Sequence, residues 1–341
     1  MTEVAVVILN YNGRNFLNQF LPSVIQFSGK AKIIVADNGS TDDSVQLIES
    51  EFAHQVEVLK IDHNRGFCGG YNFALQKIQA EYFVLLNSDV EVTEGWIEPV
   101  INLLKSDASI GAAQPRILSF HERNKFEYAG AAGGFIDSLG YPFCRGRIFS
   151  HTEEDHGQYN DTRQVFWATG ACLFIRAEVF KSLGGFDEDF FAHMEEIDLC
   201  WRLNRAGYKV YYQGESKVYH VGGGTLSASN PRKTYLNFRN GLSLLIKYLS
   251  APELLWKLPL RFGLDWTAAV LFLFSNKPTD AKAVLAAHIG FIKNVNSDIT
   301  KRKKIAKESG SFKVGGLFFR GLMPFQYFVL QKKTFTDLRE F

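Results

Sequence analysis

The chain has 341 residues, of which 46% are hydrophobic, with 38 lysines and arginines against 36 aspartates and glutamates. This length predicts about two domains of ~100–200 residues each and provides enough chain for a large apolar core. The apolar content and balanced charge exclude a disordered chain, and the absence of triplet and heptad repeats excludes fibrous proteins. The net charge of +2 is an average, because residues 301–341 hold 10 basic and 3 acidic side chains, a local charge of +7, which leaves −5 for residues 1–300.

The sequence carries no evident pattern of export or membrane insertion. Its four cysteines, at positions 68, 144, 172 and 200, form no C-x-x-C pair of the kind found in zinc and redox sites. No basic segment followed by a long apolar stretch marks a secretory signal near residue 1. The longest charge-free runs near the C-terminus, residues 266–276 and 321–331, have 11 residues each, against the ~20 of a spanning helix. We therefore expect a reduced, cytoplasmic chain.

Apolar, β-branched runs alternate with helical patterns over the first 120 residues. These patterns predict strands at residues 4–9, 31–36, 56–61 and 82–86, and helices at residues 14–27, 42–52, 71–79 and 94–104. Such alternation is typical of a mostly parallel sheet with helices on both faces, in which ligands bind at the carboxyl ends of the strands.

The remainder of the chain is less regular at first and then largely helical. Residues 121–165 show no clear pattern, and beyond residue 231 helical patterns dominate. The elements predicted between these regions are a strand pair around residues 166–175, helices from residue 177 and over about 195–206, and short strands at 208–212 and 217–219.

Each of the four strands predicted first is followed by a polar loop rich in asparagine, aspartate or glycine. These loops cover residues 10–13, 37–42, 62–72 and 87–89. Taken singly, each is compatible with an ordinary turn, and Asp42 with a helix cap. Four such loops at one edge of a sheet favour a ligand site.

Two short segments supply candidate ligands for a metal ion. Asn87 and Asp89 lie two residues apart at a strand end, and their amide and carboxylate oxygens suit Mg²⁺ or Mn²⁺ bound to phosphate. His220 ends a short strand much later in the chain, two residues before the first of the glycines at 222–224. A single histidine is more often structural, but beside a carboxylate site its imidazole becomes a candidate ligand.

Acidic residues cluster at the start of the helix predicted over residues 195–206. There they interact favourably with the helix dipole, and Asp198 can pair with Arg202 one turn later, for ~0.2–0.5 kcal/mol. Adjacent side chains diverge by about 100° around a helix, so that one acid can face a cleft while another braces the helix. A carboxylate facing the cleft is a candidate general base, because a pKa near ~4.3 leaves it ionised at neutral pH.

Seven segments in order resemble the motif set of the family 2 glycosyltransferases, most closely the bacterial rhamnosyltransferase-like branch. They are VVILNYNG (6–13), VADNGSTDDS (35–44), NRGFCGGYN (64–72), LLNSDVEV (85–92), WATGACLFIRAEVF (167–180), FFAHMEEIDLCWR (190–202) and VYHVGGGT (218–225). The resemblance covers roughly residues 4–245. It implies an inverting enzyme of the GT-A fold, an α/β, Rossmann-like architecture with a mostly parallel central sheet and flanking helices. We expect this catalytic domain at residues 1–245 and a helical, basic and aromatic region at 246–341.

The resemblance also implies roles for residues at matching positions. The donor-binding set that it implies is Asn10, Asn12, Asp37, Asn64, Gly66, Phe67, Asn87 and Ser88, with the first-strand loop and Asp37 on the nucleoside. Gly170, Ala171 and Asp198 are assigned to substrate binding. Asp89 and His220 are the implied metal ligands, and Glu196 the implied catalytic base.

This chain departs from the family pattern at two positions. Glu195-Glu196 stands where the family usually has Glu-Asp, so either glutamate is a candidate for the base. Ala36 stands before Asp37 where some relatives have a second acid.

The function implied by the resemblance is transfer of a sugar from a UDP- or dTDP-sugar, with dTDP-rhamnose among the candidates, to a hydroxyl of a glycan or lipid-linked glycan in cell-surface polysaccharide synthesis. The implied cofactor is Mg²⁺ or Mn²⁺. A catalytically degenerate sugar-nucleotide-binding protein is the alternative. The loop after the first strand lacks the G-x-G-x-x-G of dinucleotide-dependent oxidoreductases and the Gly-rich, Arg-containing signature of nucleotidyltransferases. No nucleic-acid-binding motif accompanies the basic residues, so no nucleic-acid partner is expected.

The C-terminal region mixes basic and large apolar side chains. The phenylalanines between the charges of residues 301–341 are Phe312, Phe318, Phe319, Phe325, Phe328 and Phe335. This mixture suits an anionic membrane surface, where each cation contributes ~1 kcal/mol, and residues 254–274, with Trp256 and Trp266, form a candidate interfacial helix pair. Ordinary packed helices with a solvated basic face explain the pattern equally well. The first alternative places the protein on the inner face of the cytoplasmic membrane.

Overall fold

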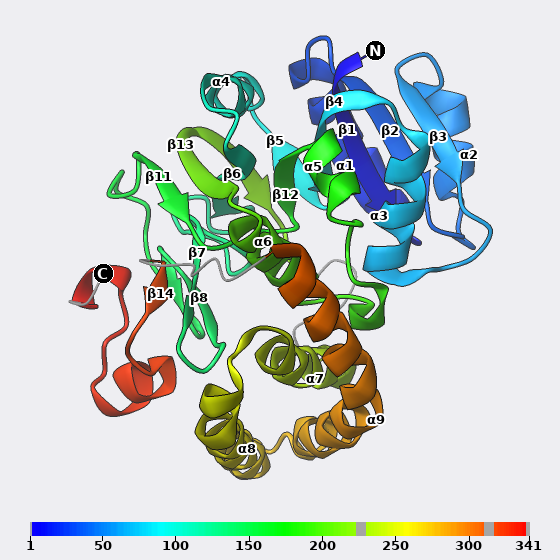
Figure 1. The fold of residues 1–341 in the computed structure, drawn as a ribbon. Helices are drawn as coiled ribbons and strands as arrows, with labels where there is room; N and C mark the ends of the chain where they lie inside the picture. The colour runs from blue at the N-terminus through cyan, green and yellow to red at the C-terminus, as the bar shows by residue number, and fades with distance from the viewer. Residues whose placement is uncertain (1, 223–229, 310–316, 339–341) are drawn as a thin grey trace.

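The computed structural model describes residues 2–222, 230–309 and 317–338 (Figure 1). Gly223, Gly224 and Thr225 of the last motif, and Phe312 of the C-terminal region, lie outside these described residues.

A large central sheet organises the first 220 residues. Its first half consists of β1 (Thr2–Asn10), β2 (Lys32–Asp37), β3 (Val56–Lys60) and β4 (Ala80–Asn87), all parallel, in the order β3-β2-β1-β4. These strands confirm the four predicted first. Because β1, β2 and β4 end at the same edge of the sheet, the polar loops that follow them meet there.

The second half of the sheet is mixed. It contains β5 (Val90–Val92), β6 (Ile110–Ser119), β11 (Thr162–Val165), β12 (Cys172–Arg176) and β13 (Lys209–His220). Strand β12 is antiparallel to both β4 and β6, whereas β13 runs parallel to β6 and antiparallel to β5 and β11. The two short strands predicted at 208–212 and 217–219 are one strand, β13, with a register shift between Gln213 and Lys217.

Helices cover both faces of the sheet because its strands are apolar on both sides. In β1, Val4, Val6 and Ile8 pack with α1 (Arg14–Phe27) and α4 (Glu98–Ser106), and α2 (Ser44–Leu47) with the turn Ile48–Phe52 lies in the same layer. Ala5 and Val7 point to the opposite layer. The helices of that layer are α3 (Gly66–Lys77), α5 (Ala177–Ser182) and α6 (Glu195–Arg205). Fold class and helix positions confirm the sequence prediction, although α3 begins earlier and α4 later than expected.

The irregular stretch after residue 120 forms a second, smaller sheet. Its strands are β7 (Gly134–Asp137), β8 (Pro142–Cys144), β9 (Arg147–Ile148), β10 (His151–Thr152) and β14 (Phe318–Phe319), in the order β10-β9-β8-β7-β14. Strand β14 comes from the C-terminal region and pairs parallel with β7. The short helical turns Phe325–Val329 and Phe335–Asp337 follow it.

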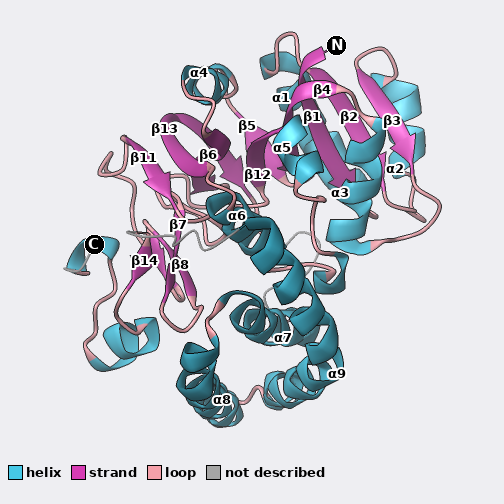
Figure 2. Cartoon of the chain, viewed as in Figure 1, coloured by secondary structure: helices cyan, strands magenta, loops and turns pink. Residues whose placement is uncertain are grey.

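Three long helices form the lower part of the molecule in Figure 2: α7 (Pro231–Tyr248), α8 (Ala251–Phe274) and α9 (Pro278–Ser309). The boundary expected after residue 245 falls inside α7, so the two expected domains share a helix. In the part of the chain that the structure describes, no helix combines the length and apolarity needed to span a bilayer.

A buried ion network attaches α7 to α6 and to the loop before it. The ammonium group of Lys247 lies 2.8 Å from Asp187 Oδ2, in the loop before α6, and contacts Asp198 Oδ1 in α6. Asp198 also accepts a 2.9 Å hydrogen bond from Arg202 and a 2.7 Å hydrogen bond from the Tyr248 hydroxyl. Burial opposes ionisation of Asp198, but Lys247 and Arg202 outweigh it and lower its pKa.

Removing the charge of Lys247 should destabilise the protein strongly. Lys247→Met retains the apolar stem but leaves the carboxylates of Asp187 and Asp198 short of a buried partner, and we expect the free energy of unfolding to fall by about 3 kcal/mol or more. Urea denaturation measures this. The control is Lys32→Met, which removes an exposed pair with Glu57 and should cost less than about 1 kcal/mol. Equal losses would contradict the role of the network.

Candidate active site

The loops after β1 and β2 are tied together at the sheet edge. Asn10 Nδ2 donates to Asp37 Oδ1 at 3.0 Å and Ser40 N donates to Asp37 Oδ2 at 3.1 Å. Asn12 Oδ1 accepts a 2.7 Å bond from the backbone of Thr41. Asp37 and Asn10 are buried, whereas Asn12 is exposed, so the first two residues shape the floor of the site and Asn12 its rim.

The loop after β3 is closed by asparagines. Asn64 Oδ1 accepts from Gly66 N at 2.9 Å and from Asn38 Nδ2 at 3.2 Å. Gly66 has a φ of +72°, and a Cβ at this position would lie 2.6 Å from the Phe191 ring. Both features require glycine here. The loop after β3 is therefore in direct contact with the segment that precedes α6.

Phe67, Gly170 and Glu195 converge on one point. A Cβ at Gly170 would lie 3.2 Å from Phe67 Cζ and 3.9 Å from Glu195 Oε1, so the glycine keeps this space open. The neighbouring Ala171 accepts a 3.0 Å hydrogen bond from Asn87 N, which joins the start of β12 to the end of β4.

Both the backbone and the ring of Phe67 contribute to this arrangement. Its backbone N–H donates to the carbonyl of Phe191 at 2.9 Å and is therefore engaged within the protein. The ring of Phe67 faces Gly170.

Asp89 and His220 lie together, as expected for residues that share a ligand. His220 Nε2 is 3.1 Å from Asp89 Oδ1 and 3.5 Å from Asn87 Nδ2. The pairing of β13 with β5, in which His220 is opposite Val90, brings these distant segments into contact. Ser88 is partly exposed beside them, and a Cβ at Gly13 would lie 3.4 Å from its hydroxyl, so the loops after β1 and β4 are adjacent.

A residue that sequence reasoning missed completes this cluster. Glu127 Oε2 lies 3.1 Å from His220 Nδ1, on the opposite side of the ring from Asp89, and both carboxylates are buried. Burial alone would lower the pKa of His220, but Glu127 and Asp89 raise it to about 10. Glu127 is a single acid in a stretch without a pattern, so only the folded chain reveals its position.

The donor set fits a divalent cation that is also bound to phosphate. Glu127 Oε2 lies 3.1 Å from Nδ1, and Nε2 faces Asp89, an arrangement common for metal-binding histidines. The two carboxylates favour the protonated imidazole, so a cation bound here would take the place of the Nε2 proton. Among the described residues, no three His, Cys, Asp or Glu side chains are placed to hold a metal by themselves. One carboxylate and one imidazole suffice where substrate phosphates supply further ligands, as is usual for Mg²⁺.

The segment before α6 has a strained backbone. Phe191, His193 and Met194 have φ values of 62°, 66° and 71°, each of which costs on the order of 1–3 kcal/mol in a residue other than glycine. Asn240 Nδ2, in α7, lies 3.1, 3.0 and 2.6 Å from the carbonyls of Phe190, Ala192 and His193. A buried side chain from the C-terminal helices thus holds the backbone that leads into Glu195.

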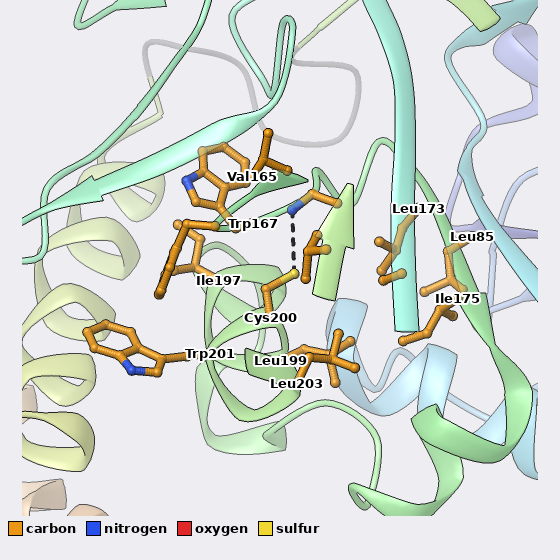
Figure 3. Packing of buried hydrophobic residues seen from close by; sticks show 14 of the residues in the cluster. Leu85, Val165, Trp167, Leu173, Ile175, Ile197, Leu199, Cys200, Trp201 and Leu203 are labelled. Carbon is orange, nitrogen blue, oxygen red and sulfur yellow. Dashed lines mark hydrogen bonds between the residues drawn. The ribbon is translucent and has the colours of Figure 1, made fainter. Parts of the chain in front are cut away.

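Helix α6 itself is fixed by its apolar face (Figure 3). Ile197, Cys200 and Leu203 are buried in the core, and Cys200 Sγ accepts a hydrogen bond from Ala168 N at 3.4 Å. Because these side chains set the rotation of the helix, the two glutamates at its start have fixed directions.

Glu195 and Glu196 occupy different environments. Glu195 is buried and Glu196 partly exposed, and each has one buried carboxylate oxygen without a hydrogen-bond partner in the described structure. Burial raises the pKa of Glu196 to about 7. Burial and then the adjacent Glu196 carboxylate raise the pKa of Glu195 well above its usual range. Glu195 therefore favours the protonated form, and Glu196 has the pKa suited to a general base at neutral pH.

Asp198 is not placed like a substrate-binding residue. Its carboxylate is fully buried and engaged by Arg202, Lys247 and Tyr248. We therefore assign it to the attachment of α6 and do not carry it into the proposed substrate site.

Comparison with known proteins identifies relatives of this chain. The family model described as "Glycosyl transferase family 2" matches residues 5–184. The O-antigen biosynthesis protein RfbC of Myxococcus xanthus is 30% identical over 195 residues, which cover 55% of this chain and 14% of that protein. The N-acetylglucosaminyl-diphospho-decaprenol L-rhamnosyltransferase of Mycobacterium tuberculosis is 27% identical over 237 residues, 64% of this chain and 76% of that protein.

Two solved structures share the fold at low sequence identity. GalNAc-T7 with UDP, GalNAc and Mn²⁺ has a TM-score of 0.57 at 16% identity, over 91% of this chain and 58% of that chain. The mannosyltransferase PcManGT of Pyrobaculum calidifontis, with GDP-Man and Mn²⁺, has a TM-score of 0.52 at 14% identity, over 90% and 85%.

The raised pKa of Glu196 predicts a pH-dependent stability. The folded chain binds more protons than the unfolded chain between about pH 4.5 and 7, so this residue lowers stability as the pH rises through that range. Glu196→Gln cannot titrate. Relative to the unmodified protein, we expect its free energy of unfolding to be higher at pH 8 than at pH 5, by up to about 3 kcal/mol.

Urea denaturation at the two pH values measures the difference. The exposed Glu178→Gln on α5 is the control and should show no such dependence. A Glu196→Gln effect that is the same at both pH values would disprove the perturbed pKa.

Proposed function

The chain belongs to glycosyl transferase family 2, and from this premise we propose that it transfers a sugar from a nucleoside diphosphate donor to a hydroxyl group of a glycan, with inversion at the anomeric carbon. The observation that carries the proposal is the environment of Glu196. This partly exposed carboxylate has an unpartnered oxygen and a pKa near neutrality, and it follows directly on Glu195, whose Oε1 lies 3.9 Å from the position of a Cβ at Gly170. One base on the acceptor side is what a single in-line displacement needs.

The relatives support a more specific proposal for the substrates. One is named as an L-rhamnosyltransferase that acts on an N-acetylglucosaminyl-diphospho-decaprenol, and another as an O-antigen biosynthesis protein. For this chain we propose a UDP- or dTDP-sugar donor, with dTDP-rhamnose first among the candidates. The proposed acceptor is a lipid-linked glycan of cell-surface polysaccharide synthesis, met at the inner face of the cytoplasmic membrane.

The proposed mechanism assigns each part of the site one task. Asn10, Asn12 and Asp37 hold the nucleoside, and the loop Asn64–Phe67 together with Asn87 and Ser88 lines the donor pocket. Glu196 takes the proton of the acceptor hydroxyl beside Gly170 and Ala171, where space is kept open. Glu195, which is buried and favours the protonated form, lies beside Gly170 and adds no second negative charge there.

Asp89 and His220 would hold Mg²⁺ or Mn²⁺. When bound, the cation stabilises the negative charge that develops on the leaving diphosphate. Glu127 orients the imidazole of His220 through Nδ1, and Asn87 Nδ2 lies 3.5 Å from the other ring nitrogen, Nε2. The solved relatives that contain a nucleotide with Mn²⁺ support this assignment.

Loss of the base should abolish transfer while donor binding persists. We expect Glu196→Gln to lower kcat about 10²- to 10⁴-fold, and kcat/KM of the unmodified enzyme to fall below about pH 7, as Glu196 is protonated. Asp89→Ala should abolish transfer and also weaken donor binding. A thermal-shift screen of UDP-, dTDP- and GDP-sugars with Mn²⁺ first identifies the donor, because a ligand of the folded state raises its stability.

Glu178→Gln on the surface of α5 controls for the loss of a negative charge. Near-normal transfer by Glu196→Gln would remove this residue from the mechanism. Donor binding without transfer or hydrolysis by the unmodified protein would instead indicate the degenerate, sugar-nucleotide-binding alternative suggested by the Glu195-Glu196 pair.

Glu127 should affect metal binding through His220. We expect Glu127→Ala to weaken Mn²⁺ binding about 10- to 100-fold, because the imidazole loses its orienting partner. Titration of Mn²⁺ in the presence of UDP, followed by electron paramagnetic resonance, measures this without turnover. Glu122→Ala, in the same segment but exposed and paired with Lys125, is the control. Unchanged Mn²⁺ affinity in Glu127→Ala would limit Glu127 to a structural role.

A further inference from the structure

Helix α8 buries charged side chains and exposes apolar ones. Between residues 254 and 274 it has only three charged side chains, Lys257, Arg261 and Asp265, and they are only 7%, 3% and 0% exposed. The outward side chains are apolar instead. The large ones are Leu255, Trp256, Leu260, Trp266, Val270, Leu271, Leu273 and Phe274. A helix that packs on a protein and faces water normally shows the opposite arrangement.

The buried charges explain why this orientation is stable. Arg261 donates to Asp265 Oδ1 at 2.9 Å and to the carbonyl of Leu139 at 3.0 Å, and its guanidinium lies 3.8 Å from the centre of the Tyr141 ring. The other oxygen of Asp265 lies 3.2 Å from His288 Nε2 in α9. Rotating α8 to bury its apolar face would break all of these contacts.

Exposed apolar side chains are concentrated in this part of the molecule. Apart from Tyr11 and Tyr128, every exposed large apolar side chain among the described residues lies between Leu255 and Leu330. Those outside α8 are Leu285, Ile289, Ile292 and Ile299 in α9, and Phe325, Phe328, Val329 and Leu330 after β14. In Figure 1 both α8 and the 325–330 segment lie toward the lower end of the molecule, away from β1–β4. Apolar patches of this extent mark interaction surfaces.

The exposed charges on this part of the chain are mostly positive. Every exposed charged residue from 254 to 307 is a lysine, at positions 277, 282, 293, 303, 304 and 307. Glu253, in the first turn of α8, is partly exposed and is paired with Lys257. Acids are present but hidden: Asp280 and Asp298 are 8% and 2% exposed. A second copy of the chain docked on this face would bring lysines against lysines, whereas an anionic lipid surface complements them.

We propose that the outward face of α8 lies in the interfacial layer of an anionic bilayer, with the lysines of the α8–α9 region directed to the lipid headgroups. The inference rests on the proposed lipid-linked acceptor and identifies the surface by which the enzyme reaches it. A helix of 24 residues is roughly 36 Å long, and it lies along the membrane rather than across it. Trp256 and Trp266 supply the amphipathic rings that favour this layer.

Vesicle flotation of the full chain tests the proposal. The vesicles contain phosphatidylcholine alone or with about one third phosphatidylglycerol. We expect flotation with the anionic vesicles, weaker flotation at high salt, and about a ten-fold or greater loss of partitioning for Leu255→Glu combined with Trp266→Glu. These residues lie about 20° apart around the helix at 100° per residue, so both point to the same side. Gln19→Glu combined with Gln46→Glu, on exposed positions of α1 and the segment after Ser44, adds the same charge elsewhere and should float normally.

Transfer to a water-soluble acceptor analogue is assayed in parallel, because it reports on the proposed function and not on attachment. Normal transfer with equal flotation of the α8 variant and the control would overturn the membrane inference and leave the function intact. Absence of flotation by the unmodified protein would do the same. Concentration-dependent dimers in analytical ultracentrifugation that the α8 variant abolishes, without flotation, would assign the face to a second copy.

Discussion

The contact between the Asn240 amide and the segment before α6 is the constraint on which the site depends. Three non-glycine residues in that segment, Phe191, His193 and Met194, have positive φ values, and they are stable only because surrounding groups hold them. The two N–H groups of the Asn240 amide are shared among three carbonyls of the segment. Without that side chain the strained turn would relax. The first residues of α6, Glu195 and Glu196, would then lose their fixed directions.

The same segment connects the two halves of the site. On one side it leads into Glu195 and Glu196. On the other, the Phe191 carbonyl accepts from the first N–H groups of α3, and the Phe191 ring fills the space beside Gly66. The loop after β3 and the start of α6 are therefore held together. The C-terminal helices, which supply Asn240 and Lys247, support the proposed active site, although the family model matches only residues 5–184.

Much of the fold and site was predictable because it depends on local signals. Apolar runs followed by Asn, Asp and Gly identified β1 to β4 and the edge where Asp37 and Asp89 lie. Strand β6 was missed because Gly111 and Pro115 interrupt its pattern, and β7 to β10 because two to four residues show no period. Nothing in the sequence around Glu127 marks it as a residue of the site. In α8, the spacing of Lys257, Arg261 and Asp265 reveals a charged face, but only tertiary contacts decide that this face is inside.

If α8 lies in the membrane interface as proposed, its fixed rotation also fixes the orientation of the whole enzyme relative to the membrane plane. A single flexible lipid anchor would leave the orientation of a protein on a bilayer free. A helix whose rotation is fixed by Arg261 and Asp265 allows only one orientation. On the proposed attachment, the proposed active site then lies at a constant height above the lipid headgroups. Only acceptors whose hydroxyl extends to that height are in reach, and they are found by diffusion in a plane. On this proposal, the fixed orientation of the enzyme on the membrane selects acceptors by their length, in addition to the selection made by the active site.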